Sequence, residues 1–168
     1  MKLAIVSFTL LFSTVAISSA NQVVPNKLPN FLIILADDLG FSDLHCYGSD
    51  IATPNLDQLA TNGLRFTQFY NTARCWPTRS ALLTGYYPQQ IHMDPPQGQL
   101  PKWTRTLPQL LKTAGYRSYH SGKWHVLGAP KPVADGGFDR SYDLEDHDRH
   151  FHPTQTLEDD RALPPVAK

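Results

Sequence analysis

The stretch Asn30-Phe-Leu-Ile-Ile-Leu-Ala-Asp-Asp-Leu-Gly40 joins an uninterrupted apolar run to two adjacent carboxylates. Six apolar residues without polar alternation predict a strand of a parallel sheet that is buried on both faces. Burial on both faces needs a layer on each side. The run therefore predicts an α/β fold with a mainly parallel central sheet sandwiched by helices.

Local start and stop signals extend this pattern downstream. Cap residues, early prolines and terminal glycines delimit the helices, and alternating side chains delimit the strands. The predicted elements are a helix from Thr53 to Gly63, a strand over residues 64–70, a helix from the Cys75 region to Gly85, a helix from Thr106 to Gly115 and a strand over residues 116–120. Residues 86–103 are predicted to be a loop, and no element is predicted between residues 131 and 168.

The charge composition excludes two classes of partner. Lys and Arg number 15, Asp and Glu number 15, and the basic residues form no cluster. Neither a nucleic acid nor an anionic membrane surface is therefore expected as a partner. The 168 residues suit one domain of ordinary size.

The first twenty residues have the pattern of a secretory signal peptide. Lys2 precedes an apolar run over residues 3–17, and Ser18-Ser19-Ala20 gives a small-residue cleavage site. The alternatives are an N-terminal membrane anchor and a buried helix. A signal peptide over residues 1–20 predicts export to the periplasm or the extracellular medium.

Two pairs of residues allow both a structural and a chemical interpretation. Cys46 and Cys75 are the two cysteines of the chain, and in an exported protein they would ordinarily form one disulfide. Asp37 and Asp38, after the predicted strand, suit either a solvated turn or a divalent cation.

The stretch Cys75-Trp-Pro-Thr-Arg79 resembles the first signature of the type I sulfatases, Cys-x-Pro-x-Arg. Gly115-Tyr-Arg-Ser-Tyr-His-Ser-Gly-Lys-Trp-His125 resembles the second, which ends in Gly-Lys-x-His. The resemblance also covers residues 30–40 and 53–57, and it extends over nearly all of the chain after residue 20. It implies the sulfatase fold of the alkaline-phosphatase-like superfamily and an arylsulfatase-like activity.

The resemblance further implies a modified cysteine and a metal ion. In this family the signature cysteine is oxidised to formylglycine by a formylglycine-generating enzyme, which would be a partner of this chain. Asp37, Asp38 and the formylglycine at Cys75 would bind Ca²⁺. Cys46 is then expected to remain a free or buried thiol.

The catalytic residues implied by the resemblance are Cys75, Arg79, Lys123 and His125. One hydroxyl of the hydrated aldehyde at Cys75 would attack the sulfur of a small-molecule or carbohydrate sulfate ester. Arg79 would stabilise the hydrate, and Lys123 would neutralise negative charge on it and on the sulfate. His125 would then take a proton from the second hydroxyl and release sulfate.

The resemblance also implies what the chain lacks. Family members are longer, and further metal ligands, a second Lys and a second His are expected beyond residue 168. Residues 21–168 are thus expected to be an incomplete N-terminal part of the catalytic domain. The alternatives are a phosphonate or phosphate diester hydrolase on the same scaffold and an inactive truncated chain.

The cluster His147, His150 and His152 is a separate candidate. It is interpreted as a substrate-facing surface, with a transition-metal site as the alternative.

Overall fold

The computed structural model describes residues 28–96, 98–145, 151 and 153–164. The chain divides into two compact units, Met1–Ala36 and Asp37–Lys168. The predicted signal peptide over residues 1–20 and the histidines His147, His150 and His152 lie outside the described residues. Among the residues described, no helix has the length and apolar character needed to cross a membrane.

The apolar run over residues 31–36 forms no strand in the first unit. Its side chains are exposed, with Leu32 at 87% and Ile34 at 70%. The prediction of a buried strand is wrong for this structure. A strand needs a neighbour to satisfy its backbone hydrogen bonds, and the described part of the first unit, residues 28–36, contains no second strand.

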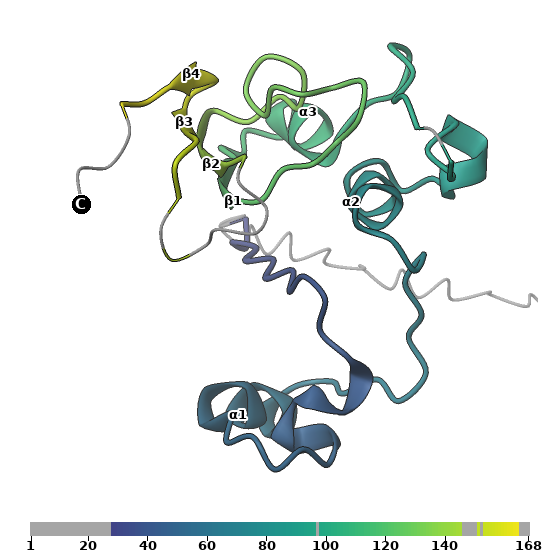
Figure 1. The fold of residues 1–168 in the computed structure, drawn as a ribbon, viewed down its shortest axis with the longest axis vertical. Coiled ribbons are helices and arrows are strands. Elements are labelled where there is room, and N and C mark those ends of the chain that lie inside the picture. The colour runs from purple at the N-terminus through teal and green to yellow at the C-terminus, as the bar shows by residue number, and fades with distance from the viewer. Residues whose placement is uncertain (1–27, 97, 146–150, 152, 165–168) are drawn as a thin grey trace, which may run out of the picture. The chain divides into compact units, whose positions relative to one another are not determined.

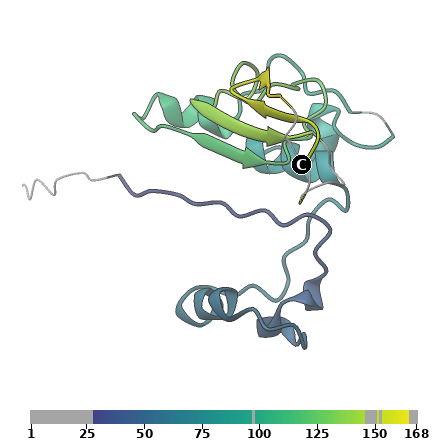
Figure 2. The same ribbon diagram turned by 60° about the vertical axis from the view of Figure 1, so that its left-hand side comes forward.

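The second unit contains a four-stranded sheet. Its strands are β1 (Tyr119–Gly122), β2 (Arg140–Leu144), β3 (Thr156–Glu158) and β4 (Arg161–Ala162), and they lie side by side in this order (Figure 1, Figure 2). Strands β1 and β2 are parallel, whereas β2–β3 and β3–β4 are antiparallel. The predicted α/β class is confirmed, and the observed sheet is mixed.

Three of these strands fall where no element was predicted. In β2 the buried side chains are polar, with Ser141 4% and Asp143 3% exposed, while Tyr142 is 42% exposed. Its inward face therefore carries no apolar alternation, which is the signal that a sequence-based search uses. Strand β1 was predicted over residues 116–120 and is displaced toward the C-terminus.

The helices follow the predicted signals. They are α1 (Pro54–Asn62), α2 (Cys75–Thr84) and α3 (Leu107–Lys112). Gly85 ends α2 in the left-handed region, at φ +74°, and its N–H donates to the carbonyl of Ala81 at 2.8 Å. The predicted strand over residues 64–70 is not formed, and Tyr70 in it is 86% exposed.

A small apolar core lies beside α2 and the segment that follows β1. Its buried members are Ile91, Met93, Leu100, Trp124, Val126 and Ala129, and Trp76, Leu83, Leu127 and Phe138 pack against them. Trp76 is adjacent to Cys75, and Trp124 lies between Lys123 and His125. The core thus holds the backbone on both sides of the predicted site. Half of its buried members come from the region 86–103 that was predicted to be a loop.

Candidate active site

Cys75 is the first residue of helix α2. A helix N-terminus carries partial positive charge because its first N–H groups have no partner within the helix. The Cys75 side chain is half-buried, and the guanidinium of Arg74 stacks on the Trp76 ring at 4.4 Å. Position 75 is therefore accessible and lies where negative charge is favoured.

Two carboxylates lie beside this thiol. Asp37, Asp38 and Cys75 each offer one ligand atom, and these atoms lie within 4.8 Å of one another. Asp38 has a left-handed backbone, with φ +54°. In the part of the chain that the structure describes, these three side chains form a group of potential metal ligands close enough to hold one ion. The structure therefore brings the three predicted metal ligands together.

Lys123 and Arg79 both pair with Asp37. The Lys123 Nζ donates to Asp37 Oδ2 at 2.6 Å, and the Arg79 Nη2 donates to Asp37 Oδ1 at 3.2 Å. Partial burial by itself raises the pKa of the Asp37 carboxyl. The hydrogen bonds and positive charges of Lys123 and Arg79 outweigh that effect and lower this pKa from its ordinary value.

Lys123 also reaches the thiol. Its Nζ lies 3.6 Å from Cys75 Sγ, and its side chain is only 9% exposed. The Arg79 side chain is 10% exposed, and its Nη1 donates to the carbonyl oxygen of Lys123. Arg79 thus ties helix α2 to the segment that carries Lys123. The result is a largely buried ammonium held directly beside residue 75.

His125 contacts Trp76, the residue that follows Cys75, through its ring. Its backbone is left-handed, with φ +48°, and its ring meets the Trp76 ring edge-on with centroids 5.8 Å apart. The structure thus joins Asp37, Asp38, Cys75, Arg79 and Lys123 by close approach and places His125 against the neighbour of Cys75.

Two histidines outside the predicted catalytic set each pair with an aspartate. His45 Nδ1 lies 3.1 Å from Asp57 Oδ2, and His120 Nδ1 lies 2.6 Å from Asp143 Oδ1. His120 and Asp143 are 23 positions apart and meet only through the pairing of β1 with β2. No local sequence signal predicts that contact.

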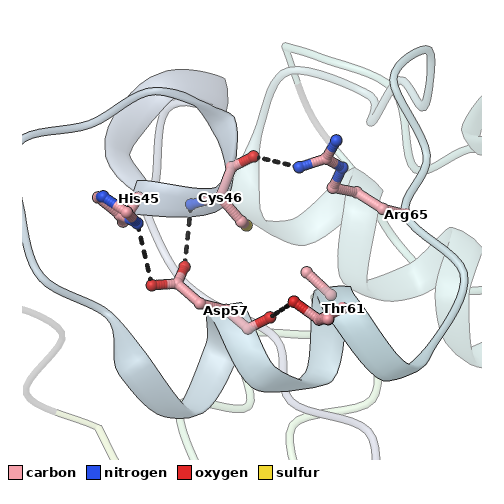
Figure 3. A pocket seen from close by; sticks show the side chains of 6 residues that line it. His45, Cys46, Asp57, Thr61 and Arg65 are labelled. Carbon is pink, nitrogen blue, oxygen red and sulfur yellow. Dashed lines mark hydrogen bonds and ion pairs between the residues drawn. The ribbon is translucent and has the colours of Figure 1, made fainter.

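A cavity whose lining includes none of the predicted catalytic residues lies beside α1 (Figure 3). It measures about 670 Å³ and is lined by His45, Cys46, Asp57, Ala60, Thr61 and Arg65. The Asp57 carboxylate accepts hydrogen bonds from the backbone N–H of Cys46 at 2.9 Å and the hydroxyl of Thr53 at 3.0 Å. These contacts fasten the 3-10 helix η2 (His45–Tyr47) to α1. Asp57 therefore acts as a structural clamp that holds η2 against α1.

Replacing Asp57 with alanine is expected to destabilise the protein by about 1 to 3 kcal/mol, because the Cys46 N–H loses its acceptor and the side chains of Thr53 and His45 each lose one contact. Urea unfolding of the full-length protein measures the change. Asp50→Ala is the matched control because Asp50 is exposed. Equal unfolding midpoints for the two variants would contradict the clamp.

Both cysteines are free, so the disulfide between Cys46 and Cys75 is not formed. The expectation that Cys46 remains a thiol is confirmed. The Cys75 thiol is therefore not consumed by a disulfide and lies free at the N-terminus of α2.

Comparison with known proteins identifies the family. The family model described as Sulfatase matches residues 29–163. The chain therefore belongs to the sulfatase family, within the alkaline-phosphatase-like superfamily.

Individual relatives agree with this assignment. The chain is 46% identical to human arylsulfatase A over 111 residues, which is 61% of this chain and 22% of that protein. It is 39% identical to mouse steryl-sulfatase over 137 residues, 74% of this chain and 22% of that protein. The chain thus spans less than a quarter of the length of these two relatives.

A solved structure shares the fold. It is described as BT4656 in complex with its substrate D-glucosamine-2-N,6-O-disulfate. The match has a TM-score of 0.65 at 30% identity and covers 76% of this chain and 26% of that chain.

Proposed function

We propose that the protein is an arylsulfatase-like sulfuric ester hydrolase that acts through a formylglycine made from Cys75. The observation that carries the proposal is the position of Lys123 Nζ, 2.6 Å from Asp37 Oδ2 and 3.6 Å from Cys75 Sγ. A nucleophile at a helix N-terminus, next to a buried cation, suits attack on an anionic ester. Membership of the sulfatase family supports this interpretation.

The position of each side chain indicates its role in the proposed reaction. Lys123 neutralises negative charge on residue 75 and on the bound sulfate, and Arg79 holds both Asp37 and the backbone of Lys123 in place. His125 accepts the proton that must leave residue 75 when sulfate is released. These assignments give each of the four predicted catalytic residues one role.

The donor set fits Ca²⁺ in part. Asp37 and Asp38 offer the oxygen ligands that Ca²⁺ prefers, whereas the sulfur of Cys75 is a soft ligand. Conversion of Cys75 to formylglycine replaces that sulfur with oxygen and makes the set uniformly hard. Asp37, Asp38 and residue 75 would hold the ion, which would supply Lewis-acid polarisation of an oxygen atom.

The proposal extends to substrate, maturation and location. The substrate class is a small-molecule or carbohydrate sulfate ester, supported by the sulfated glucosamine bound to the similar structure BT4656. A formylglycine-generating enzyme is the partner that converts Cys75. The pattern of residues 1–20 supports export through a signal peptide.

Peptide mass spectrometry of position 75, on protein purified from its native host, tests the proposal. We expect the aldehyde or its hydrate in place of the thiol, and faster hydrolysis of an aryl sulfate than of a phosphate diester. An unmodified thiol together with no sulfate ester hydrolysis would overturn the proposal. Faster cleavage of the phosphate diester would assign the protein to the diester hydrolases instead.

A further inference from the structure

The parallel strands β1 and β2 carry a hydrogen-bonded His–Asp pair outside the Cys75 cluster. His120 Nδ1 lies 2.6 Å from Asp143 Oδ1, and the Ser141 hydroxyl donates to Asp143 Oδ2 at 3.0 Å. Asp143 is 3% exposed, and the His120 side chain is 16% exposed. Both oxygens of the carboxylate therefore have a partner, and the pair has one well-defined geometry.

Aromatic rings hold the imidazole from the other side. The His120 ring meets Trp124 and Phe138 edge-on, with centroids 5.3 and 5.5 Å apart, and these two rings meet each other at 5.8 Å. The Trp124 Nε1 donates to the carbonyl of Ala129 at 2.7 Å. His120, Trp124 and Phe138 thus pack against one another as one aromatic cluster.

Trp124 connects this pair to the candidate active site. It lies between Lys123 and His125, and Lys123 directly follows Gly122, the last residue of β1. In the parallel register Gly122 is opposite Asp143. Asp143, Trp124 and His125 also line one cavity of about 260 Å³. The pair therefore fixes the backbone from which both Lys123 and His125 extend.

We propose that His120 and Asp143 are positioning residues for Lys123 and His125. The inference rests on the proposed function for its catalytic consequence, although the positioning itself does not require it. Removing one partner leaves the other buried without its hydrogen bond, so each single substitution also destabilises the protein. A positioning role therefore requires a loss of kcat larger than the loss of folded protein.

The first test is kinetic and uses the full-length enzyme. For His120→Ala and Asp143→Asn we expect kcat for an aryl sulfate to fall by roughly tenfold to a hundredfold, with KM changed less than about threefold, because misplaced catalytic groups slow chemistry more than binding. His120→Gln retains an N–H donor for Asp143 and should recover part of the loss. Glu158→Gln is the matched control because it breaks the exposed pair with Arg140 across β2 and β3.

The second test does not depend on activity. Hydrogen exchange should be faster at residues 123–126 in His120→Ala and unchanged there in Glu158→Gln. Unchanged exchange in His120→Ala would overturn the positioning role, and so would a loss of kcat that follows the folded fraction of each variant. If the wild-type protein hydrolyses no sulfate ester, the proposed function fails. The hydrogen-exchange measurement at residues 123–126 then decides by itself whether His120 and Asp143 position this segment.

Discussion

Replacing Cys75 with alanine should abolish sulfate ester hydrolysis while leaving the fold intact. The Cys75 side chain lies at a polar contact distance of 3.6 Å from the Lys123 ammonium and belongs to no apolar cluster of the described residues, and alanine is well tolerated in the first turn of a helix. Loss of a covalent nucleophile costs on the order of 10⁵-fold or more. Initial rates with an aryl sulfate and circular dichroism measure both effects.

Serine at the same position distinguishes the proposed chemistry from simple loss of activity. Cys75→Ser keeps one hydroxyl that can attack sulfur, but it lacks the second hydroxyl from which His125 would take a proton. We expect the variant to retain a covalently bound sulfo group, detected by intact mass spectrometry after incubation with substrate. Cys46→Ser is the matched control, since Cys46 is also a free thiol, and it should turn over at nearly the wild-type rate. Full activity in Cys75→Ala would contradict the assignment.

The helices could be predicted because their ends are decided by nearby residues. The Thr106 hydroxyl oxygen accepts a hydrogen bond from the backbone N–H of Gln109, and Gln109 Oε1 accepts one from the backbone N–H of Thr106. Gly85 supplies the left-handed residue that ends α2. Such capping chemistry is contained in three or four consecutive residues, so a sequence pattern carries it fully.

The strands depended on partners that a sequence pattern does not identify. Residues 31–36 are as apolar as a buried strand, but the described part of their unit contains no second strand with which they could pair. In β2 the buried face carries Ser141 and Asp143, which are stabilised by hydrogen bonds and not by apolar burial. Apolar patterning therefore predicted strands at residues 31–36 and 64–70, where none is formed, and missed β2, β3 and β4.

In the candidate site too, contacts within one motif could be predicted and contacts between distant parts of the sequence could not. Cys75 and Arg79 belong to one contiguous motif, whereas Lys123 and Asp37 are 86 positions apart in the sequence. That both belong to one site was expected only through the resemblance to the sulfatases, and their direct pairing was not predicted. That resemblance gave Arg79 a role toward the formylglycine hydrate, and the structure adds its bonds to Asp37 and to the Lys123 carbonyl. The His120–Asp143 pair is not among the catalytic residues that the resemblance implies, and only the structure reveals it.

Replacing Lys123 with methionine should reduce kcat for an aryl sulfate by about 10²- to 10³-fold, because a preorganised charge beside the developing anion is removed. Methionine keeps the length and apolar packing of the buried Lys123 stem, so the loss reports the charge. Lys131→Ala is the matched control, since Lys131 is an exposed lysine on the segment after β1. Its kcat should equal that of the wild type.

The position of Lys123 between Asp37 and Cys75 makes the outcome decisive about its role. If the ammonium served only to neutralise Asp37, then adding Lys123→Met to Asp37→Asn would cost no further kcat, because the carboxylate that it neutralises is already absent. If the ammonium acts on residue 75 and the sulfate, the double variant is slower than Asp37→Asn alone. We expect the second result, since the Nζ lies 3.6 Å from the Cys75 sulfur that the nucleophile would replace. Equal kcat in the double variant and in Asp37→Asn would reduce Lys123 to a counter-ion of Asp37.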